Sequence, residues 1–226
     1  MENVGLVTIN ENYCFKSKPT KRSMAQRAIT ILHELAHMWF GDMVTMKWWD
    51  NLWLNESFAT FISHLCADKC EELKKEYPIS WIIFNTHKGR ALTSDQMRNT
   101  HPVQGEINDT LEAETRFDTI VYKKGSSMVK QMYYYIGDEN FSKGLSLYFN
   151  QYHWDNTVFD DFMNKMIEAS GDKFNNLKEL SFNWIQKAGL NEISLDIDYD
   201  KNTNKINKFI VKQKPCLEQF PNMITH

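Results

Sequence analysis

The chain has 226 residues, of which 42% are hydrophobic and 24% are charged, and its formal net charge is −3. These values are ordinary for a globular protein with a sizeable core. They exclude the strongly basic surface that nucleic-acid binding requires, and no apolar run reaches the ~18–20 residues of a membrane span. The four cysteines show no disulfide framework, which suits a reducing compartment, and we expect a cytoplasmic protein.

The first part of the chain leads into a predicted helix. Residues 4–9 are a short run of mostly apolar and β-branched side chains, which predicts an edge strand. Residues 10–23 are polar and contain Pro19, which indicates a loop. From Met24 to Trp39 apolar residues recur at helical spacing, so we expect an amphipathic and mostly buried helix there.

This helix carries His33, Glu34 and His37. The two histidines are four residues apart, which places both imidazoles on one face of the helix. Two imidazoles and a carboxylate from elsewhere give zinc three ligands and leave a fourth position for water, on which Glu34 can act as general base. The alternative is a helix whose histidines lie on the surface or in a core, but buried imidazoles and carboxylates are costly without a partner.

We place the third ligand at Glu56, in a helix of about residues 52–70 that Asp50 or Asn51 can cap. The apolar stripe of this helix consists of Leu54, Phe58, Phe61, Ile62 and Leu65. Glu56 lies off the stripe, on a side with the small residues Ala59, Thr60 and Ser63. Small neighbours let another helix approach closely, as a shared metal requires. A solvated glutamate on a helix surface is the alternative.

The rest of the chain predicts further helices and then strands. Pro78 begins a predicted helix at about residues 79–97, and residues 106–116 indicate an acidic, irregular loop. Helical periodicity follows at 120–136, 138–151, 157–169 and 174–187. Alternating apolar residues then predict strands at 193–199 and about 206–211, joined by a turn at 201–204.

Two smaller patterns have competing interpretations. Tyr122 lies in the first turn of the 120–136 helix, where a phenol can stabilise a developing oxyanion, although a lone tyrosine more often packs in a core. Cys66 and Cys70 are one helical turn apart and near His64, which is a conceivable second metal site. No further Cys/His pair completes that site, and free buried thiols are common.

Several stretches, in the same order, resemble the zinc aminopeptidases of the aminopeptidase N and puromycin-sensitive type. In chain order they are Met1-Glu2-Asn3 as the end of a Gly-x-Met-Glu-Asn motif, His33-Glu34-Leu35-Ala36-His37, Trp53-Leu54-Asn55-Glu56-Ser57-Phe58-Ala59, and Tyr122-Lys123-Lys124-Gly125 as a Tyr-x-Lys-Gly motif. An 18-residue gap separates His37 from Glu56. The chain departs from the family at Val4, where a tryptophan is usual, and at Ser57, where a glycine is usual.

The resemblance implies an α+β, mainly helical fold: a thermolysin-like catalytic domain at residues 1–188 and the beginning of a β-sandwich domain at 189–226. It implies one Zn²⁺ per chain, peptide substrates with a free N-terminus, and an upstream β-domain or a partner chain. The implied site consists of His33, His37 and Glu56 as ligands, Glu34 as base, Tyr122 at the oxyanion and Glu2 at the substrate's α-amine.

Two expectations follow from this resemblance. If an upstream domain normally covers this chain, the chain alone is expected to be a weak aminopeptidase or inactive, and an exposed apolar patch larger than the few hundred Å² normal for a monomer is expected near residues 1–9 or 189–213. A non-catalytic zinc-site protein that acts as an interaction module is the alternative function. Measuring metal content and hydrolysis of an aminoacyl amide distinguishes a zinc aminopeptidase from this non-catalytic alternative.

Overall fold

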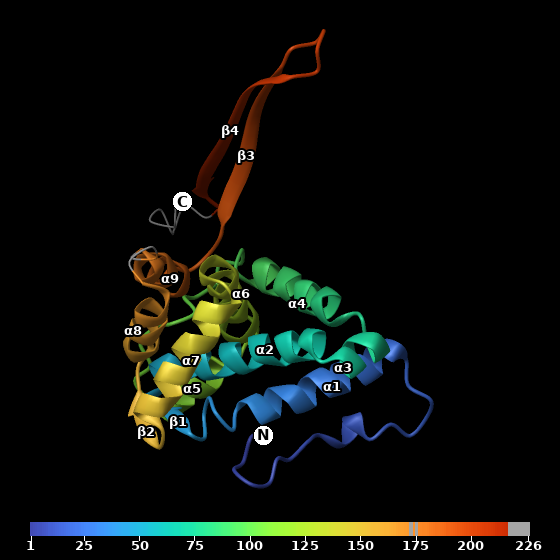
Figure 1. Ribbon diagram of the computed structural model, residues 1–226, viewed down its shortest axis with the longest axis vertical. Coiled ribbons are helices and arrows are strands. Elements are labelled where there is room, and N and C mark those ends of the chain that lie inside the picture. The colour runs from blue at the N-terminus through green and yellow to red at the C-terminus, as the bar shows by residue number, and fades with distance from the viewer. Residues whose placement is uncertain (172–173, 175, 217–226) are drawn as a thin grey trace.

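The computed structural model describes residues 1–171, 174 and 176–216, as a helical body from which a β-hairpin projects (Figure 1). The helices are α1 Lys21–Ala36, α2 Leu52–Lys69, α3 Glu71–Glu76, α4 Ser80–Ser94, α5 Thr110–Thr115, the π-helical turn η3 Ile120–Lys124, α6 Gly125–Ile136, α7 Asp138–Tyr152, α8 Phe159–Ser170 and α9 Leu177–Gln186. The 3₁₀ turns are η1 Glu11–Tyr13 and η2 Trp49–Asn51, and the strands are β1 Val44–Met46, β2 Asp155–Thr157, β3 Asn191–Tyr199 and β4 Ile206–Pro215. The described part of the chain is therefore mainly helical, as predicted, and it contains two small sheets.

Helix α2 is the centre of the body. It is buried on nearly every side, polar residues included, because other elements cover it. Figure 1 shows α1, α4 and α6 around it. Its aromatic residues Trp53, Phe58 and Phe61 are at most 2% exposed and pack with aromatic side chains of α7 and α8. The helix that carries Glu56 is consequently held on several sides. No helix in the described part of the chain is long and apolar enough to cross a membrane.

Helix α1 begins three residues earlier than predicted and is less buried. Thr20 caps it, because its Oγ1 accepts a hydrogen bond from the Ser23 amide at 3.0 Å, so residues 21–23 join the helix. Ala25 and Ile29 are buried on the inner face, whereas Leu35 is 47% exposed. The expectation of a mostly buried helix is therefore wrong for its outer face.

Three local predictions are corrected. Residues 4–9 form no strand; they turn, with the Leu6 amide bonded to the Asn3 carbonyl, because no neighbouring strand pairs with them. The segment 106–116 contains a helix, α5, because Asp109 caps it through the Glu112 amide at 2.7 Å. β1 and β2 pair in parallel although they are distant in the chain, a pairing that local sequence patterns do not predict.

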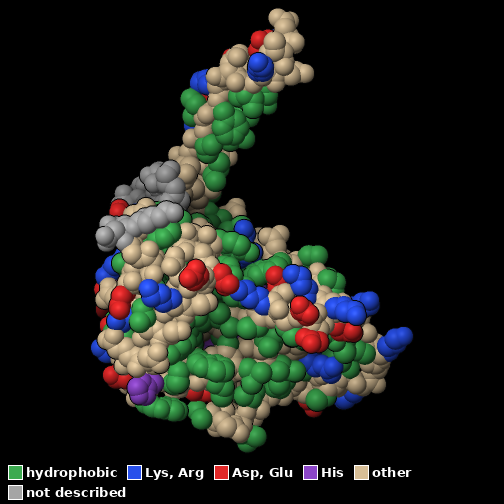
Figure 2. Space-filling model, in the orientation of Figure 1, with side chains coloured by type: hydrophobic (Ala, Val, Ile, Leu, Met, Phe, Trp, Pro, Cys, Tyr) green, Lys and Arg blue, Asp and Glu red, His purple; other side chains and the backbone are tan. Residues whose placement is uncertain are grey.

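The hairpin β3–β4 has one apolar and one charged face. Its strands are antiparallel, with Leu195 opposite Val211, and the predicted strands are confirmed with longer bounds. The apolar face is formed by side chains that are at least half exposed, among them Ile193, Leu195, Tyr199, Phe209 and Val211. Figure 2 shows these hydrophobic side chains along the projecting hairpin. The other face carries cross-strand ion pairs such as Lys208–Asp196. Exposed apolar side chains are thus present in the segment 189–213, where a patch is expected, and residues 217–226 lie outside the described part.

A buried ion pair joins the base of the hairpin to the helical body. Lys124 Nζ lies 2.7 Å from Asp95 Oδ2, and both side chains are at most 3% exposed. The same ammonium donates to the carbonyl oxygens of Lys187 and Gly189, at 3.0 and 3.2 Å. Asp95 Oδ1 accepts from the Gly189 amide at 2.8 Å and from the Thr100 hydroxyl at 2.6 Å. The network therefore fixes η3 relative to the start of β3.

We expect Lys124→Met to lower the free energy of unfolding by ~3–5 kcal/mol, because the Asp95 carboxylate stays buried without its partner. Lys143→Met, at an exposed lysine of α7, should change it by no more than ~0.5 kcal/mol. Chemical denaturation measures both variants. An unchanged unfolding midpoint in Lys124→Met would show that the ion pair contributes nothing.

Candidate metal centre

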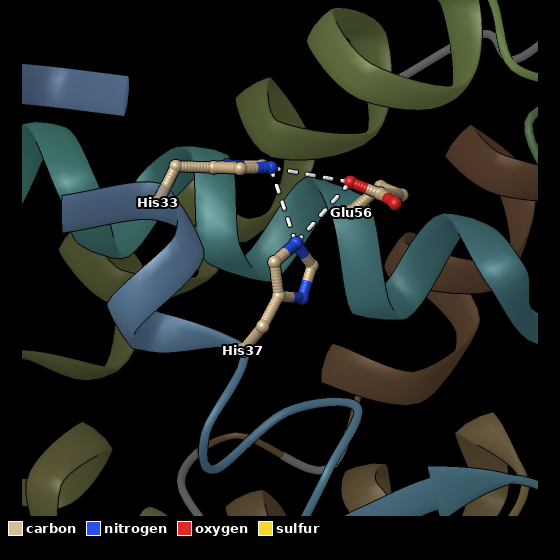
Figure 3. Close-up of side chains that lie close together, drawn as sticks. All are labelled: His33, His37 and Glu56. Carbon is tan, nitrogen blue, oxygen red and sulfur yellow. Dashed lines mark hydrogen bonds and ion pairs between the residues drawn. The ribbon is translucent and has the colours of Figure 1, made fainter. Parts of the chain in front are cut away.

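His33 and His37 of α1 and Glu56 of α2 point toward one another (Figure 3). The two Nε2 atoms are 3.1 Å apart, and Glu56 Oε2 lies 3.3 Å from His33 Nε2 and 3.4 Å from His37 Nε2. His37 and Glu56 are buried, and His33 is partly exposed. The i, i+4 spacing on one helix and the small-residue side of the next thus bring the three predicted side chains together.

Two groups that sequence reasoning missed fix the orientation of the His37 ring. Its Nδ1 lies 2.9 Å from the Phe40 carbonyl oxygen and 3.1 Å from Asn55 Oδ1. A carbonyl oxygen only accepts, so Nδ1 carries the proton and donates. In the neutral ring this leaves the lone pair on Nε2, which is the atom that faces Glu56.

The turn after α1 depends on Gly41. Its φ is +126°, and an added Cβ would lie 2.7 Å from Asn55 Oδ1. A side chain at this position would therefore push away the amide that holds the His37 ring. The adjacency of Asn55 to Glu56 and a glycine shortly after His37 are the only sequence signals for this arrangement.

The residues present fit a zinc ion. Ligand atoms bound at ~2.0–2.2 Å to a tetrahedral zinc lie ~3.3–3.6 Å from one another, close to the 3.1–3.4 Å separations here. Glu56 Oε2 is buried and makes no hydrogen bond within the described part of the chain. The negative charge of Glu56 is balanced at this point by a cation, which is a proton on His37 when no metal is bound and a metal ion when one displaces that proton. Among the described residues, this is the only such group of three or more His, Cys, Asp or Glu side chains.

The pKa values of His37 and Glu56 are both shifted toward the charged forms of these side chains. Burial favours the neutral form of both partners, but the Glu56 carboxylate overcomes it at His37 and raises the pKa of that imidazole to about 9. Burial likewise opposes ionisation of Glu56, yet the two imidazoles lower its pKa to about 2. Glu56 is therefore ionised at neutral pH, as a metal ligand must be.

Glu34 and Glu2 lie beside the three ligand candidates. Glu34 Oε2 accepts a hydrogen bond from the Met1 ammonium at 2.8 Å, and its side chain is 13% exposed. The charge of Glu2 contributes to raising the pKa values of His37 and Asp42, so its carboxylate lies close to this centre. The structure thus places both sequence-predicted glutamates near the histidines.

Tyr122 faces the centre from the π-helical turn η3. Its ring centroid is 6.2 Å from that of His33. Burial, and then the negative charge of Glu56, raise the pKa of Tyr122 well above its ordinary value, so the phenol keeps its proton. Single π-helical turns inside helices are frequent at functional sites. The sequence predicted a regular helix here, and the π turn is a correction.

Asp118 holds the start of η3 and was missed from the sequence. Its Oδ1 accepts from the amides of Ile120 and Val121, at 2.9 and 3.0 Å. Its Oδ2 lies 2.8 Å from His101 Nε2. His101 therefore supports the tyrosine-bearing turn through Asp118. An acidic residue shortly before a predicted helix is the signal that identifies such a cap.

Helix α2 and η3 also contact each other directly. Ser57, next to Glu56, donates a hydrogen bond of 2.5 Å to the carbonyl of Val121, next to Tyr122. Gly125 allows this approach, because a Cβ there would overlap the Ser57 hydroxyl. The ligand candidate and the phenol are thereby held in a fixed relation. Cys66 and Cys70, by contrast, belong to no group of three potential ligands in the described residues.

Comparison with known proteins gives one family. Residues 1–184 match the model of the peptidase family M1 domain. The chain is similar to aminopeptidase N of Streptomyces lividans, 43% identical over 215 residues, which are 95% of this chain and 24% of that protein. It is also similar to tricorn protease-interacting factor F2 of Thermoplasma volcanium, 39% identical over 88% of this chain and 25% of that protein. Aminopeptidase M1-D of Oryza sativa subsp. japonica is 40% identical over 84% of this chain and 21% of that protein. The chain spans about a quarter of the length of these relatives.

Proposed function

The chain belongs to peptidase family M1, and on that premise we propose that it supplies the catalytic centre of a zinc-dependent aminopeptidase. The convergence of His33, His37 and Glu56 carries this proposal, because three such atoms hold zinc and leave a fourth position open. Zinc, when bound, activates water as a nucleophile near neutral pH and polarises the scissile carbonyl. The interaction-module alternative is not favoured, because Glu34, Tyr122 and Glu2 all lie beside the proposed ligands.

The side chains around the ligands have separate roles. Glu34 takes the proton of the attacking water and passes it to the leaving amine. Tyr122, which keeps its proton, donates a hydrogen bond to the oxyanion that develops on the carbonyl oxygen. Glu2 binds the free α-amine of the peptide. A carboxylate at a fixed distance from the reacting carbonyl restricts cleavage to the first residue of a substrate.

We further propose how the chain divides into domains and which surfaces another domain or a partner chain covers. We assign residues 1–188 to a thermolysin-like catalytic domain and residues 189–226 to the beginning of a β-sandwich. The exposed apolar face of β3–β4 supports this assignment, since a two-stranded sheet is marginal without a covering layer. An upstream β-domain or a partner chain, together with the rest of the sandwich, would cover the exposed residues near Glu2 and on the hairpin.

Hydrolysis of leucine p-nitroanilide, compared with its N-acetylated form by absorbance, tests the proposed activity. We expect the free-amine substrate to be cleaved and the acetylated one not, because acetylation removes the charge that Glu2 binds. Glu2→Gln should raise KM for the free amine. Equal rates for both substrates would indicate an endopeptidase or another zinc hydrolase, and no cleavage by zinc-loaded protein would contradict catalysis by this chain.

A further inference from the structure

A second cavity adjoins the metal centre on the His33 side. Its volume is about 220 Å³, and it lies between α1, α2, α4 and η3. His33 and Tyr122 form one wall, so the cavity opens where the reacting carbonyl of a substrate would lie. The remaining wall is polar and includes Tyr13, Thr60, His64, His87 and Lys123. The proposed mechanism uses none of these five residues.

Lys123 is the only fully charged side chain among the described residues of the cavity wall. No aspartate or glutamate is found among the described residues that line it. Burial, and then the nearby charge of Lys123, lower the pKa of His64 to about 3 and that of His87 to about 4, so both rings are neutral at pH 7. The cavity therefore presents one ammonium and no negative charge of its own.

The Lys123 ammonium contacts no neutralising partner, and the charge that opposes the effect of burial on it is that of Glu56 at the metal centre. The ammonium lies 5.6 Å from the centroid of the Tyr122 ring, but within the described residues it makes no hydrogen bond and no ion pair. Burial lowers the pKa of Lys123 to about 8, which still leaves it charged at neutral pH. A partly buried ammonium without a counterion is unfavourable, and a carboxylate that enters the cavity would relieve this cost.

Buried polar atoms without hydrogen-bond partners also indicate that a polar ligand group enters the cavity. Thr60 is 2% exposed and lines the cavity, yet its Oγ1 has no hydrogen-bond partner in the described structure. The Nδ1 atom of His87 is also buried without a partner. Buried polar groups are normally hydrogen-bonded, so such atoms in a cavity wall mark where a polar ligand group binds. The Thr60 hydroxyl is a donor that a carboxylate oxygen accepts from.

The position of the cavity tells which part of a peptide reaches it. The charge of Glu2, the proposed anchor of the α-amine, acts on His37, Asp42 and Tyr122, but neither Glu2 nor Asp42 lines the cavity. A peptide whose amine is held by Glu2 therefore has its amine outside the cavity, and the residue after the scissile bond extends past His33 and Tyr122 toward Lys123.

We propose that this cavity binds a carboxylate carried by the residue after the scissile bond, with Lys123 as its charged partner and Thr60 as a second donor. The inference rests on the proposed function. The carboxylate has two possible sources: an acidic side chain at that position, or the terminal carboxylate of a dipeptide. Lys123 is then a residue that determines specificity, whereas Glu34 and Tyr122 perform the chemistry.

Two matched substrate pairs test the proposal. Leu-Asp-Ala-Ala-amide against Leu-Asn-Ala-Ala-amide isolates the acidic side chain, and Leu-Ala against Leu-Ala-amide isolates the terminal carboxylate. We expect kcat/KM to be about tenfold higher for the anionic member of at least one pair, as for one charge-assisted hydrogen bond. Lys123→Met should reduce that ratio to about one, Lys123→Arg should retain most of it, and Lys143→Met should leave it unchanged.

Binding measured without turnover separates this proposal from the proposed function. In a Glu34→Gln background, calorimetric titration with the same four peptides should show the same Lys123-dependent preference, of about tenfold in Kd. A preference in one pair identifies the source of the carboxylate. Equal binding within both pairs, or a preference that persists in Lys123→Met, would overturn the proposal. If titration shows the preference but no peptide is cleaved, the subsite stands and the proposed catalysis fails.

Discussion

Glu34→Gln is expected to retain zinc and to lose nearly all turnover. The substitution keeps the size of the side chain and leaves His33, His37 and Glu56 unchanged, but an amide cannot accept the proton of the attacking water. General-base catalysis contributes ~10²–10⁴-fold, and we expect the upper end of that range or more, because the same group also protonates the leaving amine. Stopped or continuous assays of aminoacyl p-nitroanilide cleavage measure the loss, and metal analysis of the same preparation measures zinc.

Glu76→Gln, at an exposed glutamate at the end of α3, is the matched control and should behave as the parent. If Glu34→Gln lost zinc together with activity, Glu34 would be a ligand or a support of the site, not its base. If it retained more than about a tenth of the parent kcat, another group would act as the base.

Glu56→Gln is expected to abolish zinc binding and, with it, turnover. Loss of a group that merely supports a ligand costs ~10–100-fold in metal affinity, and loss of the only carboxylate ligand should cost more. Competition with a chelator of known affinity measures the change. Because the Glu56 carboxylate lies between two imidazoles in a buried site, its removal also leaves His37 without its counter-charge.

The two variants together separate ligand from base. Zinc retained in Glu34→Gln and lost in Glu56→Gln is the expected pattern. An affinity in Glu56→Gln within threefold of the parent would contradict the ligand set, even if activity fell.

The sequence was sufficient to predict which side chains converge, because that depends on local rules. Four-residue spacing places His33 and His37 on one helix face, and the small residues beside Glu56 allow α1 to approach α2. The main helices and the hairpin were likewise predictable from periodicity. The role of His33, His37 and Glu56 as metal ligands is the proposal that the experiments address.

Features that depend on tertiary contacts were not predictable. The His37 ring is held by a backbone carbonyl at Phe40 and by Asn55, and their meeting requires the turn at Gly41. Asp118 caps a π turn that periodicity cannot distinguish from an α-helix. Residues 4–9 have the composition of a strand but lack a neighbour to pair with, so composition alone gave the wrong prediction there.

Zinc bound to this chain should be held by two imidazoles and one carboxylate. Zinc K-edge X-ray absorption of the protein loaded with one equivalent of zinc measures these neighbours. We predict only nitrogen and oxygen neighbours at ~2.0–2.2 Å, two of them imidazoles, and a spectrum that changes in Glu56→Gln. Sulfur neighbours at ~2.3 Å would place the metal at cysteine residues and would contradict this ligand set.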